Sequence, residues 1–409
     1  MEKIYKKVQG AAVAGFMAAA LLASCNSQPA TQTSHESAVN TDTVNLKFTV
    51  EEAPEWTALF NRQHGWFGAD GIFAIPLNGS DSTSSNTDST MFLFSDTMLG
   101  DIVNGKLKPG FRMIHNSVAY MKGVSADTGS IRFIWDSAGD RKAESVFLPS
   151  TAKTQQGDYY WMGDGFVNQE LNNNINVFGH RVRNISTAAF GFKEVGNTII
   201  VIPHNSRAPF KELRQLDMPA VYEGDDDNQY ASFGVSVFVN IREAKAPNPD
   251  GYIYIYGLRG KEKNLLVARV KPASFENFNE WRYWDGNNWN ADIKKVANTT
   301  SRASNELSVT PLRDGRYALV FQTDGIGSTV GLRLGTSPIG PWGPVIKLWD
   351  CPEVKMSKNI ITYNAKAHPN LSKPGELLIS YNVNSFDFFK DIMLYPDLYR
   401  PRFIRVKLQ

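Results

Sequence analysis

Short β-rich runs recur along most of this chain, bounded by Gly, Asn, Asp and Pro, and they restrict its fold more than any other feature. Within them polar and apolar positions alternate and β-branched and aromatic residues are frequent, as a pleated, half-buried surface requires. Helical periodicity is confined to short pieces near residues 209–216 and 273–278. The pattern predicts an all-β domain over residues 46–409.

One unit recurs within this pattern: a turn of small or polar residues, a strand, and a second apolar strand. The units start near residues 68, 161, 231, 304 and 365, at intervals of about 60 to 95 residues, which suffice for a four-stranded blade with loops. We therefore predict a five-bladed β-propeller, in which the first strand of each blade lines a central channel and the five turns meet in one funnel. A double β-sandwich is the alternative.

The charge balance and the cysteine content exclude several classes of protein. The 409 residues carry 43 Lys and Arg against 41 Asp and Glu, without a long basic run, so nucleic acid is not an expected partner. Only two cysteines, Cys25 and Cys351, are present, which rules out a disulfide framework and a cysteine-based zinc site.

The N-terminus has the pattern of an export signal. Three lysines within the first seven residues precede an apolar stretch, residues 11–22, that is too short to span a bilayer. The Leu-Ala-Ser-Cys sequence ending at Cys25 resembles the lipobox of bacterial lipoproteins, which implies cleavage before Cys25 and lipidation of its sulfur. We expect a signal peptide (1–25), a flexible Ser/Thr-rich tether (26–45) and a lipid-anchored protein of the cell envelope, on the periplasmic or surface face of the outer membrane. An ordinary secretory signal is the alternative.

Three carboxylates interrupt the starts of predicted channel-lining strands: Asp70, Asp164 and Glu306. Burial at such a place disfavours the charged form and separates pKa values, as acid/base chemistry requires. Asp96, at the end of another predicted strand, is a fourth candidate. The alternative for each Asp-Gly pair is a plain turn.

The candidate substrate-binding residues are aromatic, imidazole or amide side chains at strand ends and turns, where they could contact a sugar ring: Trp66, His115, Asn116, Trp161, His204 and His368. No local metal motif such as His-Glu-x-x-His occurs. We expect no cofactor and no catalytic metal, and leave open a structural calcium or other ion in the funnel.

Several motifs resemble a known family. Residues 68–77, 92–97 and 113–117 resemble the opening of a secreted bacterial family once catalogued as domain of unknown function 4185, and residues 365–370 and 378–385 are similar to its last blade. The resemblance implies a five-bladed β-propeller. Some members, assigned to glycoside hydrolase family 183, are endo-acting hydrolases of D-arabinan.

Carried over by residue, the resemblance implies that Asp70 is the base or nucleophile, that Glu306 or Asp164 is the general acid, with Glu306 preferred, and that Asp96 modulates a pKa or orients a partner. The expected function is an exported lipoprotein glycosidase that cleaves a polysaccharide or oligosaccharide, with inversion preferred by analogy to other five-bladed glycosidases. Alternatives are a non-catalytic glycan-binding lipoprotein and a propeller that binds protein at the envelope.

Overall fold

The computed structural model describes residues 41–82, 88–137, 142–186, 191–219 and 229–409, so the expected signal peptide with Cys25 and most of the tether lie outside the described residues. The described part is all-β, as expected, apart from two short α-helices, α1 (Pro54–Leu59) and α2 (Phe388–Leu394). It also has five 3₁₀ turns, at Pro272–Ser274, Phe278–Glu280, Ile293–Lys295, Pro352–Lys355 and Pro369–Leu371. None of the helices in these ranges is long and apolar enough to cross a membrane.

The two segments expected to be helical contain no α-helix. Residues 209–213 are bends and irregular backbone, and Arg214–Asp217 is a strand, in which Leu216 pairs across the sheet with Ile199. Residues 273–278 run from the end of one 3₁₀ turn, through an ordinary turn, to the start of a second 3₁₀ turn.

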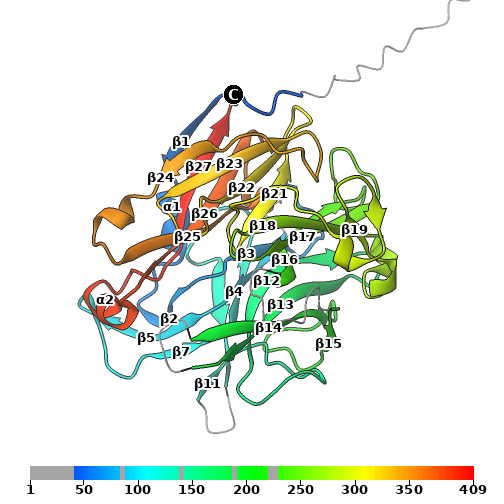
Figure 1. Cartoon of the computed structure of the whole chain (residues 1–409). Coiled ribbons are helices and arrows are strands. Elements are labelled where there is room, and N and C mark those ends of the chain that lie inside the picture. The colour runs from blue at the N-terminus through cyan, green and yellow to red at the C-terminus, as the bar shows by residue number, and fades with distance from the viewer. Residues whose placement is uncertain (1–40, 83–87, 138–141, 187–190, 220–228) are drawn as a thin grey trace, which may run out of the picture. The chain divides into compact units, whose positions relative to one another are not determined.

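Four antiparallel sheets have strands whose order in space follows their order in the chain (Figure 1). The first sheet is β3 (Phe73–Pro76), β4 (Ser89–Phe94), β8 (Ser117–Lys122) and β9 (Ile131–Ile134). The second is β12 (Tyr159–Asn168), β13 (Asn174–Asn184), β14 (Phe192–Ile202) and β15 (Arg214–Asp217). The third is β16 (Ala231–Asn240), β17 (Tyr252–Arg259), β18 (Asn264–Val270), β19 (Arg282–Trp284) and β20 (Trp289–Asn290). The fourth is β21 (Leu307–Pro311), β22 (Tyr317–Gln322), β23 (Thr329–Gly335) and β24 (Ile346–Asp350).

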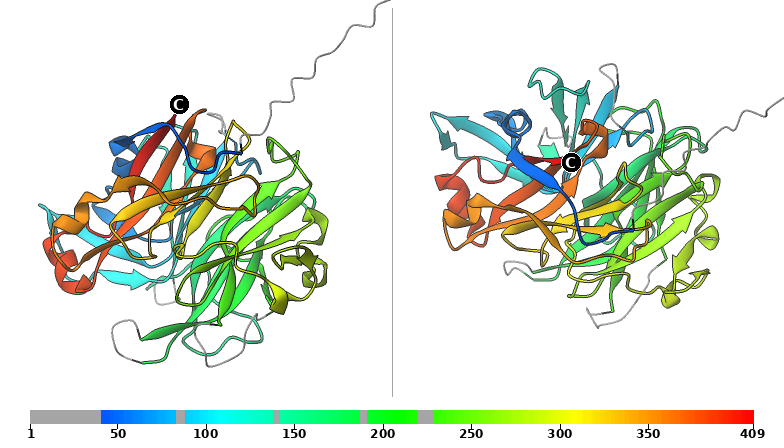
Figure 2. Two further views of the ribbon diagram at one scale, coloured as in Figure 1. Left: turned by 45° about the horizontal axis from the view of Figure 1, so that its top comes forward. Right: turned by 90° about the horizontal axis from the view of Figure 1, so that it is seen from above.

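A fifth sheet joins both ends of the domain. It consists of β25 (Ile360–Ala367), β26 (Glu376–Ser385), β27 (Arg402–Leu408) and β1 (Phe48–Glu52). The early strand β1 pairs antiparallel with the last strand, Phe48 opposite Leu408, so Figure 2 shows the blue strand beside the C-terminus. A further sheet consists of β2 (His64–Ala69), β5 (Thr97–Val103), β6 (Lys106–Leu107) and β7 (Arg112–Ile114), in which β5 pairs with the other three. A separate pair is formed by β10 (Asp136–Ser137) and β11 (Ala143–Glu144).

The five sheets pack one against the next through their first strands. β12 contacts β3 and β16, and β21 contacts β16 and β25. Lys366 of β25 donates from Nζ to the Ile72 carbonyl just before β3, at 3.0 Å, which links the last sheet to the first. The described core accordingly forms five apolar clusters, each with members from two neighbouring sheets. The arrangement is β-propeller-like.

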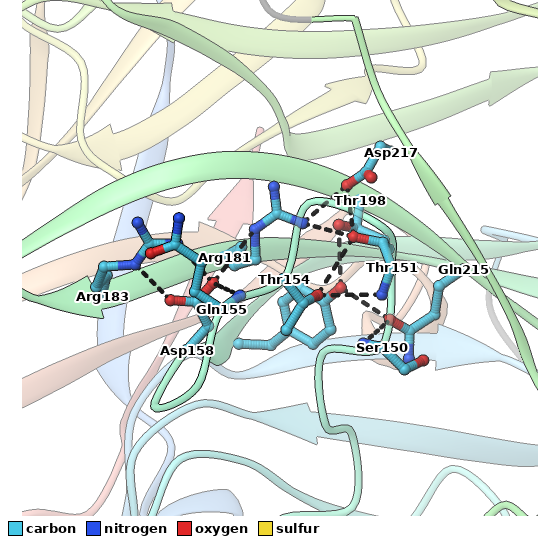
Figure 3. A network of polar contacts seen from close by, with 11 residues as sticks. Ser150, Thr151, Thr154, Gln155, Asp158, Arg181, Arg183, Thr198, Gln215 and Asp217 are labelled. Carbon is cyan, nitrogen blue, oxygen red and sulfur yellow. Dashed lines mark hydrogen bonds and ion pairs between the residues drawn. The ribbon is translucent and has the colours of Figure 1, made fainter.

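A buried polar network fixes the second sheet to the loop that precedes it (Figure 3). The Arg181 guanidinium, 2% exposed, donates from Nη1 to Asp217 and to Thr151, both at 2.8 Å. Arg183 donates to both oxygens of the fully buried Asp158, at 2.6 and 2.9 Å. Burial favours a higher pKa for Asp158, but the hydrogen bonds and charge of Arg183 outweigh it and hold the pKa below the ordinary value.

Candidate active site

The candidate carboxyl groups meet at one end of the first strands, which we call the leading end because β3, β12, β16, β21 and β25 all begin there. In each antiparallel sheet, the start of the first strand lies beside the end of the second, as Leu307 opposite Phe321 and Ile360 opposite Ser385 show. Asp70 precedes β3, Asp96 follows β4 and Glu306 precedes β21. The antiparallel connectivity therefore brings three residues that are distant in sequence to one end.

Asp70 carries a proton near neutral pH. Its Oδ2 accepts a 2.8 Å hydrogen bond from the Tyr363 hydroxyl, and Tyr399 also bonds to the carboxyl group. Its Oδ1 is buried without a hydrogen-bond partner among the described residues. Burial, and then the negative charges of Asp96 and Glu306, raise the pKa of Asp70 to about 8. The group is thus a buried acid with one oxygen unengaged.

Asp96 lies beside an aromatic wall. Its Oδ1 accepts from the Trp161 indole N–H at 3.2 Å and contacts His115 Nδ1 at 3.0 Å. The His115 ring stacks on Tyr159 with centroids 3.7 Å apart, and Trp161 meets Phe192 edge to face. The Asp96 side chain is 19% exposed, so this carboxylate and its wall can reach a ligand.

Glu306 is held by a buried cation. Its Oε2 contacts Lys366 Nζ, and its Oε1 accepts from the Asn364 amide at 2.7 Å. Burial raises the pKa of Glu306 more than the charges of Lys366 and His180 lower it. A bulge between Tyr363 and Lys366 changes the alternation of β25, so that Tyr363 reaches Asp70 while Lys366 reaches Glu306.

Asp164 has a different environment. It lies in the bulge of β12, where its Oδ1 accepts from Gly165 N at 2.8 Å and its Oδ2 from Val237 N at 2.7 Å. Burial raises its pKa to about 7 against these hydrogen bonds, and the charges that act on it are those of Asp81 and Lys366. Asp164 therefore links β12 to β16 and is not grouped with Asp70.

A cavity of about 540 Å³ extends from the level of Asp164 and Lys366 toward the opposite ends of the first strands. Ser236, Ser308 and Lys373 line it, whereas Asp70, Asp96 and Glu306 do not. We place the candidate site at the leading end because the grouped carboxyl groups, and not the cavity volume, carry the chemistry.

The other candidate binding residues divide by exposure. His115 and Trp161 form the wall beside Asp96, as described above. Trp66 is 1% exposed and stacks on Phe133 in the core, and Asn116 is fully buried with its amide bonded to the Phe147 and Tyr160 carbonyls. His368 is also buried; it bonds to Ser380 at 2.7 Å, and burial lowers its pKa to about 3.

His204 lies exposed in the loop after β14, which ends at Ile202, so it is on the side away from the leading end. Trp66 and Asn116 consequently have no surface for a substrate. His368 lines the cavity and lies after the end of β25, away from the leading end, and His204 is not near Asp70. The leading end also contains four residues that the sequence did not predict: Tyr363, Lys366, His180 and Glu194. No local motif marks them, because a bulge or a second strand brings each of them to the site.

Among the described residues, no group of three or more His, Cys, Asp or Glu side chains could hold a metal ion. The second cysteine, Cys351, is buried at 1% exposure, and burial raises the pKa of its thiol to about 11. The thiol is thus an unreactive core group.

The fold and the site together define an all-β, propeller-like protein with a cluster of carboxyl groups at one end of its central strands. Residues 54–408 match the family described as "Domain of unknown function (DUF5005)", and the chain belongs to that family. This is not the family that the sequence motifs resemble, so the D-arabinanase assignment remains a proposal. No curated protein matches the chain.

Solved structures are similar to this chain at low identity. A "putative hydrolase" from Bacteroides ovatus ATCC 8483 is 20% identical, with a TM-score of 0.66 over 90% of this chain and 97% of that one. An exo-β-1,3-galactanase from Phanerochaete chrysosporium, solved with β-1,3-galactotriose, is 13% identical, with a TM-score of 0.43 over 83% and 60% of the two chains. A glycoside hydrolase family 43 protein from Bacillus licheniformis is 12% identical, with a TM-score of 0.39 over 82% and 51%.

Proposed function

We propose that this protein is a glycoside hydrolase whose acid/base pair is Asp70 and Glu306. The observation that carries the proposal is the grouping of two buried carboxyl groups in opposed surroundings at the leading end. Asp70 is buried against two phenols, and its pKa is raised to about 8, whereas Glu306, whose pKa burial also raises, contacts the Lys366 ammonium, which lowers that pKa. Pairs of carboxyl groups with separated pKa values are the machinery of glycoside hydrolysis.

The surroundings favour one assignment of roles. Asp70 donates its proton to the glycosidic oxygen as the C–O bond to the anomeric carbon breaks. Glu306 accepts a proton from the water that attacks that carbon from the opposite side, with inversion. This assignment exchanges the two roles expected from the sequence, because the carboxyl group next to a cation is the one that ionises first. The charge of Asp96 raises the pKa of Asp70, the acid in this scheme.

The aromatic wall supports a carbohydrate substrate. Trp161 and Phe192, with His115 stacked on Tyr159, present flat apolar faces beside the Asp96 carboxylate, and sugar rings bind to such a combination of flat faces and hydrogen-bond acceptors. The "hydrolase" description of the Bacteroides ovatus structure agrees with this proposal.

The proposal extends to the fold, the substrate and the location. The five linked sheets support a five-bladed β-propeller. We propose a complex polysaccharide as substrate, with a D-arabinan-type furanoside as the first to assay because of the motif resemblance. The lipobox at Cys25 supports an exported protein anchored by lipid in the cell envelope.

A non-catalytic glycan-binding protein is the second candidate, because both oxygens of Glu306 are already engaged by Lys366 and Asn364.

The experiment that separates the hydrolase from the glycan-binding protein measures release of reducing sugar from a panel of polysaccharides, including D-arabinan, by wild type, Asp70→Asn and Glu306→Gln. The control is Asp101→Asn, since Asp101 is 60% exposed on β5. Hydrolysis that both site variants abolish and the control retains is expected. Glycan binding without hydrolysis by the wild type would establish the second candidate.

Aryl glycosides with a good leaving group then test the roles, because such a leaving group needs no proton. Asp70→Asn should retain turnover on them, and Glu306→Gln should not. The opposite result would restore the roles expected from the sequence.

A further inference from the structure

A histidine–carboxylate pair at the leading end has no role in the acid/base scheme above. His180 of β13 places Nδ1 2.9 Å from Glu194 Oε1 of β14, and the side chains are 12% and 25% exposed. Glu194 lies three residues before Asn197, whose Nδ2 lies 3.0 Å from the same ring nitrogen and 3.3 Å from the same carboxylate oxygen.

The surrounding hydrogen bonds fix the orientation of this pair. Asn197 Oδ1 accepts from Phe233 N at 2.8 Å, which leaves Nδ2 as a donor. Glu194 Oε2 accepts from Ser232 Oγ at 3.3 Å, and Tyr230 also donates to Glu194. With its proton on Nδ1, the His180 ring donates to Glu194 Oε1, and Asn197 Nδ2 donates to the same oxygen. Nε2 is then the nitrogen left for another partner.

His180 Nε2 lies against the bulge of β12. A Cβ at Gly163, in the bulge of β12, would lie 2.9 Å from Nε2 and 2.5 Å from the Gly234 carbonyl, so only glycine fits there. No described residue forms a hydrogen bond with Nε2. The charge of Glu306 raises the pKa of His180, and the charge of His180 lowers the pKa of Glu306, so the two groups interact electrostatically.

We infer that His180, oriented by Glu194, is a further catalytic residue of the site, and that its Nε2 bonds an oxygen of the substrate or of the attacking water beside Glu306. The inference rests on the proposed function and adds a group to it. A histidine held by a carboxylate can donate from Nε2 when protonated and accept when neutral, which suits an oxygen that changes charge during reaction.

The charged groups around the ring set its behaviour with pH. Burial lowers the pKa of His180, but the charge and hydrogen bond of Glu194 and then the charge of Glu306 outweigh it and leave the pKa above the ordinary value. Lys263, near the start of β18, and Tyr230 act on Glu194. The protonated ring therefore persists to higher pH than in an ordinary histidine.

Two measurements test the inference. The first follows the histidine ring resonances by NMR against pH, with His180→Gln to assign the His180 signal and His204 as the exposed reference. In Glu306→Gln, the His180 midpoint should move to lower pH while the His204 midpoint stays unchanged. Addition of a bound glycan should shift the His180 signal alone. Unchanged His180 signals in both experiments would overturn the inference.

The second measurement compares kcat/KM over pH for wild type, His180→Gln, Glu194→Gln and the control His204→Gln. We expect a loss of at least tenfold with a changed pH profile in the first two variants, and a control within twofold of wild type. Wild-type values for all three variants would also refute the role. A different outcome is that the protein cleaves no glycan, yet the His180 signal responds both to Glu306→Gln and to added glycan. That outcome would overturn the proposed function and retain His180 as a binding residue.

Discussion

Removal of one member of the Glu306–Lys366 pair should destabilise the protein strongly, and the two single variants should differ in their response to pH. Glu306 is 8% exposed and Lys366 2% exposed, so either charge left alone is buried. In Glu306→Gln, the Lys366 ammonium retains the Ile72 carbonyl at 3.0 Å and the Phe73 ring at 4.4 Å as its partners. Breaking a buried pair in this way costs about 3–5 kcal/mol in the free energy of unfolding.

The Lys366→Met variant leaves a carboxyl group, which can be neutralised by a proton. Because Lys366 lowers the pKa of Glu306, its removal raises that pKa further above the unfolded value. A group with a raised folded pKa costs stability when it is ionised, so the loss in Lys366→Met should shrink as pH falls from 7 to 5. The loss in Glu306→Gln should not shrink, because that variant has no carboxyl group at this position for a proton to neutralise.

Urea denaturation followed by tryptophan fluorescence at pH 7 and pH 5 measures both effects. The double variant Glu306→Gln, Lys366→Met should lie closer to wild type than either single variant, because both charges are gone and only packing differs. Single variants within about 0.5 kcal/mol of wild type at pH 7 would refute the reasoning, since surface substitutions have effects of that size.

Three further predictions follow from the same contacts. Asp96→Asn should lower the pH at which kcat/KM falls on the alkaline side, which we expect near pH 8 in the wild type, because the charge of Asp96 raises the pKa of Asp70. An unchanged alkaline midpoint would exclude Asp70 as the acid. Asp158→Asn should lower the free energy of unfolding by roughly 3 kcal/mol at pH 7. The difference in Tm from wild type should become smaller in acid, because the stability that comes from the lowered pKa of Asp158 is lost as the carboxyl group takes up a proton. A Tm difference independent of pH would contradict this. Gly163→Ala should lower the free energy of unfolding by about 1–3 kcal/mol, because the new Cβ would overpack against the Gly234 carbonyl. Gly129→Ala should leave the free energy of unfolding almost unchanged in the same assay, because no atom lies nearer than 3.5 Å to the new Cβ.

The sequence predicted the class of fold because strand patterns are local. Alternating runs such as Tyr252–Arg259 and Tyr317–Gln322 are strands at the expected places. The recurring units near residues 231 and 304 begin the first strand of a sheet, whereas residue 365 lies near the end of β25 and not at its start. The sequence also picked out Asp70, Asp96 and Glu306, because a carboxyl group beside a buried strand is unusual in any sequence.

Other candidates showed the limit of local patterns. Trp66 and Asn116 have the residue types of a binding site, yet both are buried, since an indole or an amide can equally fill a core or bond to loop carbonyls. Asp164 stands in a turn-like Asp-Gly pair within a strand bulge, and there it binds backbone N–H groups of a neighbouring sheet.

What the sequence by itself determined is therefore the all-β fold, the repeat of strand units and the presence of carboxyl groups at strand starts. What only the tertiary structure decided is which groups meet. The bulge in β25 directs Tyr363 to Asp70 and Lys366 to Glu306, although these residues are some 300 and 60 positions apart along the chain. Protonation and charge pairing depend on such distances in space, and strand periodicity carries no information about them.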